Sequence, residues 1–257
     1  QLRLTLLHIH SKIYTCQSRF MTRQSFILSI AVMYPEGTSN EDLAALVSNL
    51  PKHPELQVVL CENVVIKGAP RRIVEVSTNG NLKRVQSTLP VFEFDTARNT
   101  IKGHCDGKWI LSLDLDEYIA TPISAVIGAL KQLSDDTEGV TCTILSHVRE
   151  PGDNVLMPYR RIASTTTRLF RNIDTVQWLS RCHEVVDFTI PPDKVADSSI
   201  TILHYGYDTT ADELKGKYER NIQLLAKEVS DPRTKDTYDH ALRYLIVSCT
   251  QYNNEFC

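Results

Sequence analysis

The chain has 257 residues, 42% of them hydrophobic, which is enough for one sizeable buried core. Its 28 Lys and Arg residues nearly balance its 31 Asp and Glu residues, and the net charge of −3 gives no general attraction to nucleic acid or to an acidic membrane. No apolar run is long enough to span a bilayer, and Leu2–Ile9 lacks the cleavage site of a signal peptide.

The first half of the chain predicts alternating strands and helices. The apolar run Ser25–Val32 predicts a buried strand, and Ser39 or Asn40 is expected to cap a helix that runs to Leu50. A second strand is predicted at Leu56–Leu60 and a third at Arg72–Val76. This order favours a parallel sheet with crossover helices, the pattern of the α/β class. Because strand-like sequence begins only at about Ser25, residues 1–24 are predicted to be an extension.

The second half continues the alternation and then becomes helical. We expect helices at Thr96–Cys105 and Pro122–Leu133, strands at Lys108–Leu113, Val140–His147, Thr166–Arg171, Val185–Ile190 and Ile200–Leu203, and amphipathic helices at Asp212–Val229 and Asp236–Thr250. The seven Cys residues are odd in number and contain no C-x-x-C pair. This pattern disfavours a zinc site and a disulfide framework, and it favours reduced thiols in a cytoplasmic protein.

Two carboxylates follow the most apolar predicted strand of the second half. Asp114 and Asp116, here called the acidic motif, follow Lys108–Leu113. In open α/β sheets, ligands bind beyond the carboxyl ends of the strands. A divalent cation together with a diphosphate is the natural partner for such carboxylates, because hard oxygen ligands suit Mg²⁺ or Mn²⁺. One Asp would bind the metal while the other accepts from a ribose hydroxyl; a solvated acidic turn is the alternative.

Six short segments, in this order, resemble glycosyltransferase family 2, especially its bacterial branch of peptide and lipopolysaccharide-core glycosyltransferases. They are Phe94-Asp95-Thr96-Ala97-Arg98-Asn99, Gly107–Glu117 (G-K-W-I-L-S-L-D-L-D-E), Arg168-Leu169-Phe170-Arg171-Asn172, Trp178 with His183-Glu184, Ile202–Tyr207 (I-L-H-Y-G-Y), and Lys217 with Arg220-Asn221 and Leu224-Leu225. The first half departs from the family pattern, since Glu62 stands without the family's Ser/Thr/Gly-rich turn.

The resemblance implies a GT-A-like, mostly parallel sheet flanked by helices, with a catalytic domain over residues 25–210 and a helical segment over 211–257 packed on it. It implies a hexosyltransferase that takes a nucleotide-sugar donor, most simply a UDP-sugar, with Mn²⁺ or Mg²⁺. Asp116 would bind the metal, and His204 would complete the metal site or serve a structural role. Asp114 would face the ribose or assist the metal, and Glu62 would lie on the nucleobase side.

The resemblance also implies inversion at the sugar, from an α-linked donor to a β-linked product. Such a displacement requires one base, for which Glu184 is the first candidate, with His183 and Glu117 as alternatives. Arg98 would neutralise donor phosphate or pair with the acidic motif, and Arg171 would reach phosphate. Trp178 would stack on a sugar or on the acceptor. The structural alternatives are a core position for Trp178, loop ordering for His183 and Glu184, and a salt bridge at the start of a helix for Arg98.

Two other functions remain open from the sequence. The same chemistry could act on modified bases in viral DNA, with Arg71-Arg72 and Arg160-Arg161 at the phosphates, or the chain could be an inactive binding module that keeps the fold. The P-loop, dinucleotide and G-x-S-x-G motifs are absent from the sequence. The acceptor, whether a saccharide, a lipid-linked group, a peptide or a DNA base, and the oligomeric state are not indicated by any motif.

Overall fold

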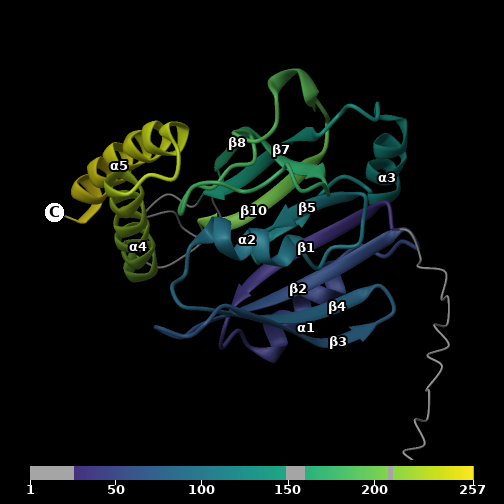
Figure 1. Ribbon diagram of the computed structural model, residues 1–257, viewed down its shortest axis with the longest axis horizontal. Coiled ribbons are helices and arrows are strands. Elements are labelled where there is room, and N and C mark those ends of the chain that lie inside the picture. The colour runs from purple at the N-terminus through teal and green to yellow at the C-terminus, as the bar shows by residue number, and fades with distance from the viewer. Residues whose placement is uncertain (1–25, 149–159, 208–210, 257) are drawn as a thin grey trace, which may run out of the picture.

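A computed structural model describes residues 26–148, 160–207 and 211–256. These residues form one sheet, helices that cover both of its faces, and a pair of long helices at the C-terminal end (Figure 1). The predicted extension over residues 1–24 lies outside the described residues, as do Cys16 and Cys257 and the side chains of Arg160 and Arg161.

The first half of the sheet is parallel. Its strand order is β3-β4-β2-β1-β5, and the neighbours β4, β2, β1 and β5 run in one direction. Strands β1, β2 and β5 have short apolar runs that are buried on both faces, the composition expected of parallel strands, whereas in β4 only the alternate residues Val85, Ser87 and Leu89 are buried. The bounds of the strands are β1 Leu28–Pro35, β2 Leu56–Val65, β4 Leu82–Leu89 and β5 Trp109–Leu113, with β3 Arg72–Asn79 antiparallel on the edge.

The second half of the sheet is mixed. It continues from β5 in the order β8-β7-β10-β6, with β9 paired to β7. The pairs β5–β8, β7–β8 and β10–β6 are antiparallel, whereas β10–β7 and β7–β9 are parallel. The bounds are β6 Glu117–Ile119, β7 Gly139–Val148, β8 Arg160–Arg171, β9 Val195–Ala196 and β10 Thr201–Tyr207, and a short 3-10 helix, η1, spans Pro192–Lys194.

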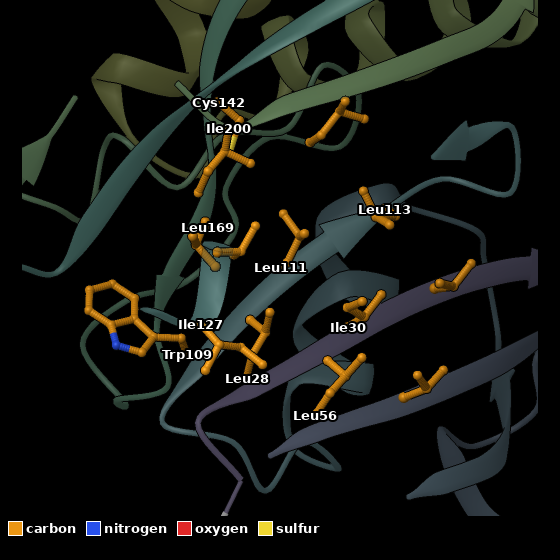
Figure 2. Packing of buried hydrophobic residues seen from close by; sticks show 14 of the residues in the cluster. Leu28, Ile30, Leu56, Trp109, Leu111, Leu113, Ile127, Cys142, Leu169 and Ile200 are labelled. Atoms are coloured by element: carbon orange, nitrogen blue, oxygen red, sulfur yellow. The ribbon is translucent and has the colours of Figure 1, made fainter. Parts of the chain in front are cut away.

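Helices cover the two faces of the sheet because side chains alternate along each strand. On one face Leu28, Ile30 and Leu111 pack with α1 (Asn40–Asn49) and α3 (Ile123–Gln132); Figure 2 shows part of this cluster. The side chains on the other face of the sheet, such as those of Ala31 and Ile110, pack with α2 (Phe94–Lys102). The sheet is therefore the middle layer of three, which holds its carboxyl edge rigid.

Two long helices complete the chain. They are α4 (Ala211–Ser230) and α5 (Lys235–Phe256), which pack on each other. One of their contacts with the rest of the protein is a small apolar cluster in which Leu224, Leu225 and Ala241 meet Cys182, with Phe94 at its margin. The helical pair therefore packs at the start of α2 and on the loop that contains Cys182.

The predicted α/β class, with a sheet flanked by helices, is confirmed. The parallel arrangement holds for the pairs among β4, β2, β1 and β5 but not for β8, whose pairing to both neighbours is antiparallel. Ser39 caps α1 as predicted, its side chain accepting from the backbone amide of Asp42. The strand predicted at Val185–Ile190 is wrong: this segment forms turns with one isolated bridge at Val185. Strands β4, β6 and β9 were not predicted.

Within the described residues, no helix is both long enough and apolar enough to cross a membrane.

Gly107 lies close to the backbone of β1, so a substitution there tests the packing of the parallel half of the sheet. A Cβ at this position would lie 2.5 Å from the backbone nitrogen of Ser29 and 2.7 Å from the carbonyl carbon of Leu28, both in β1. Because backbone atoms cannot move aside cheaply, we expect Gly107→Ala to lower the free energy of unfolding by about 1–3 kcal/mol.

The control is Gly128→Ala in α3, where a Cβ meets nothing within 4 Å. Removing glycine from a helix interior should leave stability unchanged or raise it by up to about 1 kcal/mol. Urea unfolding of both variants gives the comparison, and equal stability of the two would contradict this account of Gly107.

Candidate active site

The candidate site lies where the parallel strands end. The acidic motif follows the last residue of β5, and Glu62 lies near the carboxyl end of β2. Strand β1 separates β5 from β2, and Tyr34 of β1 pairs with Glu62. The acidic motif and Glu62 therefore share one edge of the sheet, the edge at which open α/β sheets bind ligands.

Asp116 and His204 face each other across this edge. The distance from His204 Nε2 to Asp116 Oδ1 is 3.7 Å, and the backbone amide of Tyr205 donates to the carbonyl of Asp116 at 3.0 Å. His204 Nδ1 lies 3.1 Å from the hydroxyl of Ser146 on β7, which orients the ring so that Nε2 faces the carboxylate. The side chains of Asp116 and His204 are 41% and 19% exposed, so both are accessible to solvent.

This pair fits a Mg²⁺ or Mn²⁺ ion of the kind that binds with a phosphate ligand. Among residues 26–148, 160–207 and 211–256, no group of three or more His, Cys, Asp and Glu side chains is arranged to hold a metal. A site with one carboxylate and one imidazole instead matches cations that take their remaining ligands from water and substrate phosphates.

A buried arginine lies behind the acidic motif. Arg98 in α2 is only 2% exposed; its Nη2 donates to Asp114 at 2.7 Å and its Nη1 to the hydroxyl of Ser112 at 2.6 Å. Its Nε donates to Glu184, and its guanidinium lies 4.8 Å from the ring centroid of Trp178. These carboxylates raise the pKa of Arg98 against the opposing effect of burial. Arg98 therefore joins Asp114 to Glu184, as expected for a residue that pairs with the acidic motif.

Glu117 is a buried carboxylate at the same turn. Its Oε2 accepts from the backbone amide of Asp114 at 2.9 Å, and its Oε1 accepts from Arg168 at 3.2 Å. Burial raises the pKa of Glu117 to about 7, with Arg168 acting in the opposite direction. Arg98 and Arg168 hold the pKa of Asp114 at about 2, against the effect of its own burial. Glu117 thus holds its proton to a higher pH than Asp114 does, because the environments of the two carboxylates differ.

Glu184 lies at the end of a short loop. Backbone hydrogen bonds in both directions between Leu179 and Val185 close the loop. Two of its residues have positive φ angles, 80° at Ser180 and 53° at His183, which non-glycine residues rarely adopt. The His183 ring stacks on Tyr244 of α5 at 4.2 Å, and burial lowers the pKa of His183. The loop therefore places Glu184 on Arg98 and His183 against α5.

Asn99, the neighbour of Arg98, fixes the segment before this loop. Its side-chain amide donates to the carbonyl of Trp178 at 2.9 Å and accepts from the amide of Trp178 at 2.9 Å. Trp178 is 2% exposed and lies in the α2-side core, which corresponds to its structural alternative rather than to a sugar platform. The adjacent Arg98 and Asn99 thus tie α2 to Trp178 and to Glu184.

Arg171 does not lie beside the acidic motif. It pairs with Trp109 at the start of β5, and its side chain donates to the carbonyls of Ser134 and Thr137. The prediction that Arg171 reaches donor phosphate therefore conflicts with its position, because the acidic motif follows the other end of β5. Glu62 lies near the carboxyl end of β2 and accepts from Gln86 of β4 at 2.7 Å.

Arg168, rather than Arg171, lies beside the acidic motif. Its Nη2 lies 3.6 Å from Asp114 and 3.2 Å from Glu117. Both arginines occur in the same sequence motif, and only the antiparallel register, with Leu169 opposite Leu111, shows which one lies towards the end of β5. Ser112, which binds Arg98, was likewise not predicted, because a serine inside an apolar strand carries no signal of its own.

The described cysteines form no disulfides. Cys61, Cys105, Cys142 and Cys182 are buried, Cys249 is half-buried, and all five are free thiols. Burial raises the pKa of Cys61, Cys105 and Cys182 to about 12, so these thiols are poor nucleophiles at neutral pH.

Comparison with known proteins gives one relative in sequence and several in structure. No protein-family model matches the chain. A TPR repeat-containing protein of Synechococcus elongatus is 30% identical over 183 residues, which cover 68% of this chain. The chain spans 42% of the length of that curated relative, less than half.

Among solved structures, S. aureus TarS has 14% identity and a TM-score of 0.43, over 85% of this chain and 42% of that chain. TarS 1–349 in complex with UDP has 15% identity and a TM-score of 0.40, over 85% and 70%. The mannosyltransferase PcManGT from Pyrobaculum calidifontis, in complex with GDP-Man and Mn²⁺, has 12% identity and a TM-score of 0.44, over 91% and 74%. At these TM-scores, all below 0.5, we base the functional assignment on the residues of this chain.

The raised pKa of Glu117 predicts a pH-dependent cost to stability. Its value in the folded protein, about 7, exceeds the ordinary 4.5, so the folded state binds more protons than the unfolded state between these values. The contribution of Glu117 to the free energy of unfolding should therefore fall as the pH rises from about 4.5 to 7.

The measurement is urea unfolding of the parent chain and Glu117→Gln at several pH values between 4.5 and 7.5, with a chelator present. The amide does not titrate, so the stability of the parent relative to the variant should decrease as the pH rises. A difference between the two that is constant across this range would contradict the assignment.

Proposed function

We propose that the chain is a metal-dependent, inverting glycosyltransferase that moves a sugar from a nucleotide-sugar donor, a UDP-sugar, to an acceptor nucleophile. One observation carries the proposal: at the carboxyl edge of the sheet, Arg98 links Asp114 of the acidic motif to Glu184, beside the Asp116–His204 pair. A metal-binding pair and a separate carboxylate at one sheet edge are the groups that a displacement at a phosphorylated sugar needs.

The donor half of the site consists of Asp116, His204, Asp114 and Glu62. Asp116 and His204 would hold the cation, which would supply a positive charge that offsets the charge on the leaving diphosphate. Asp114 stays ionised because of its two arginines, and its half-exposed carboxylate accepts from a ribose hydroxyl. Glu62, towards the β2 side, is the candidate on the nucleobase side.

The acceptor half centres on Glu184. Its Oε1 accepts from Arg98, and within the described part of the chain no hydrogen bond to Oε2 is formed. Oε2 can therefore take the proton of an acceptor hydroxyl. Glu117 is a weaker candidate because both of its oxygens are already bound and it is 2% exposed. His183 is weaker because its ring stacks on Tyr244.

The reaction is one displacement. The acceptor oxygen forms a bond to the anomeric carbon as the bond from that carbon to the diphosphate oxygen breaks, and the acceptor proton passes to Glu184. The electron pair leaves with the nucleoside diphosphate. Because attack is opposite the leaving group, an α-linked donor gives a β-linked product, and no covalent sugar–enzyme intermediate forms.

Asp116 tests the donor half. We expect Asp116→Ala to abolish Mn²⁺-dependent binding of UDP while leaving the melting temperature within a few degrees of the parent, because the side chain is 41% exposed. Calorimetric titration of UDP with Mn²⁺ and with a chelator measures the effect.

The matched control is Asp193→Ala, which removes an exposed carboxylate in η1. It should bind UDP like the parent. Metal-dependent binding that survives in Asp116→Ala would show that the cation is held elsewhere.

Glu184 tests the acceptor half. We expect Glu184→Gln to lower kcat about 10²–10⁴-fold, as is typical when a general base is lost, with donor affinity nearly unchanged. The measurement is steady-state transfer from UDP-sugars to a panel of saccharide acceptors.

An unchanged kcat in Glu184→Gln would move the base to Glu117 or His183. An α-linked product by NMR would contradict inversion itself. Intact UDP binding by the parent without turnover of any donor would instead favour a binding module.

A further inference from the structure

The loop that carries Glu184 has a strained backbone. Ser180 and His183 both have φ angles in the left-handed region, where a side chain crowds the backbone. Such residues persist only where surrounding contacts hold them, and they concentrate at functional sites. Hydrogen bonds within the loop supply part of this restraint, since the Leu179–Val185 backbone pair closes the loop and the Ser180 hydroxyl donates to the carbonyl of Cys182 at 2.7 Å.

Arg181, between the two strained residues, supplies the restraint from outside the loop. It is 6% exposed and uses all three nitrogens of its guanidinium. Nε donates to Glu93 at 3.0 Å, Nη1 to Glu228 at 2.9 Å and to the carbonyl of Asp231 at 2.7 Å, and Nη2 to the Asp231 carboxylate at 3.2 Å. The planar fork of arginine suits such a set of acceptors better than a lysine ammonium does.

The partners of Arg181 belong to the two elements on either side of the loop. Glu228 and Asp231 lie at the end of α4, and Glu228 is 0% exposed. Glu93 immediately precedes α2, the helix of Arg98, and it also binds Lys227 and Arg233, each at 2.6 Å. The carbonyl of Arg181 accepts from the amide of Phe94 at 3.1 Å. One buried side chain therefore fixes the loop to α2 on one side and to α4 on the other.

We propose that Arg181 is a positioning residue for the base, and that through it the α4–α5 pair forms part of the catalytic unit. Arg181 does not touch the substrates; it keeps the strained loop in the conformation that places Glu184 against Arg98. This inference rests on the proposed role of Glu184. A residue that acts only through Glu184 should matter for the chemical step and not for donor binding.

The test compares kcat and UDP affinity in two backgrounds, the parent and Glu184→Gln. Because Arg181→Met alone would leave Glu228 buried without its cation, the principal variant is Arg181→Met/Glu228→Gln, which removes both charges. In the parent background we expect kcat to fall at least about 10-fold and UDP affinity to change less than about 2-fold. In the Glu184→Gln background the same change should lower kcat less than about 2-fold further, because the group it positions is already lost.

Two further variants sharpen the result. Arg181→Lys keeps the charge and should retain part of the rate, whereas Arg243→Ala, on the exposed side of α5, should retain all of it. All assays are run well below the melting temperature of each variant. The inference is overturned if kcat in the parent background is unchanged, or if kcat falls by the same factor in both backgrounds, which would indicate general damage to the fold.

The failure of this inference is distinct from the failure of the proposed function. If Glu184→Gln alone lowers kcat but the Arg181→Met/Glu228→Gln variant does not, only the role of Arg181 is wrong. If Glu184→Gln leaves kcat unchanged, the base assignment fails, and the role proposed for Arg181 fails with it.

Discussion

The candidate site depends on one buried charge. Arg98 is almost wholly inside the protein, where an unpaired guanidinium would be very costly, and it is paired with Asp114, Glu184 and the hydroxyl of Ser112. Removing one partner of a buried ion pair typically costs about 3–5 kcal/mol, because the remaining charge stays buried. The end of β5, the helix α2 and the loop before Val185 must therefore come together for Arg98 to be satisfied.

Because Glu184 must reach Arg98 to pair this buried charge, the loop that carries Glu184 lies beside the site, together with the ion pairs of Arg181 that hold the loop. The glutamate reaches Arg98 from a loop with two left-handed residues, and Arg181 ties that loop to the start of α2 and to the end of α4. Arg98 and Arg181 thus occupy related positions, each a buried guanidinium that joins separate elements. Arg98 contacts Glu184, the proposed base, directly. Arg181 holds the loop that carries Glu184.

Local pattern predicted the strand that precedes the acidic motif, the cap of α1 and the two long C-terminal helices, because these depend on residues close in sequence. It could not choose between Arg168 and Arg171, since the register of β8 on β5 decides which one reaches the acidic motif. It predicted a strand at Val185–Ile190, where the segment folds into turns. The pairing of Arg98 with Glu184 spans 86 residues, and no spacing rule reports such a contact.

A crystal structure of the chain with UDP and Mn²⁺ tests the assignment of the site most directly. We predict that the cation is bonded to Asp116 and His204, that the diphosphate completes its coordination, and that Arg98 still joins Asp114 to Glu184. A diphosphate bound away from Asp116 and His204, or a Glu184 carboxylate turned from Arg98 onto the nucleotide, would contradict the assignment of donor and acceptor halves.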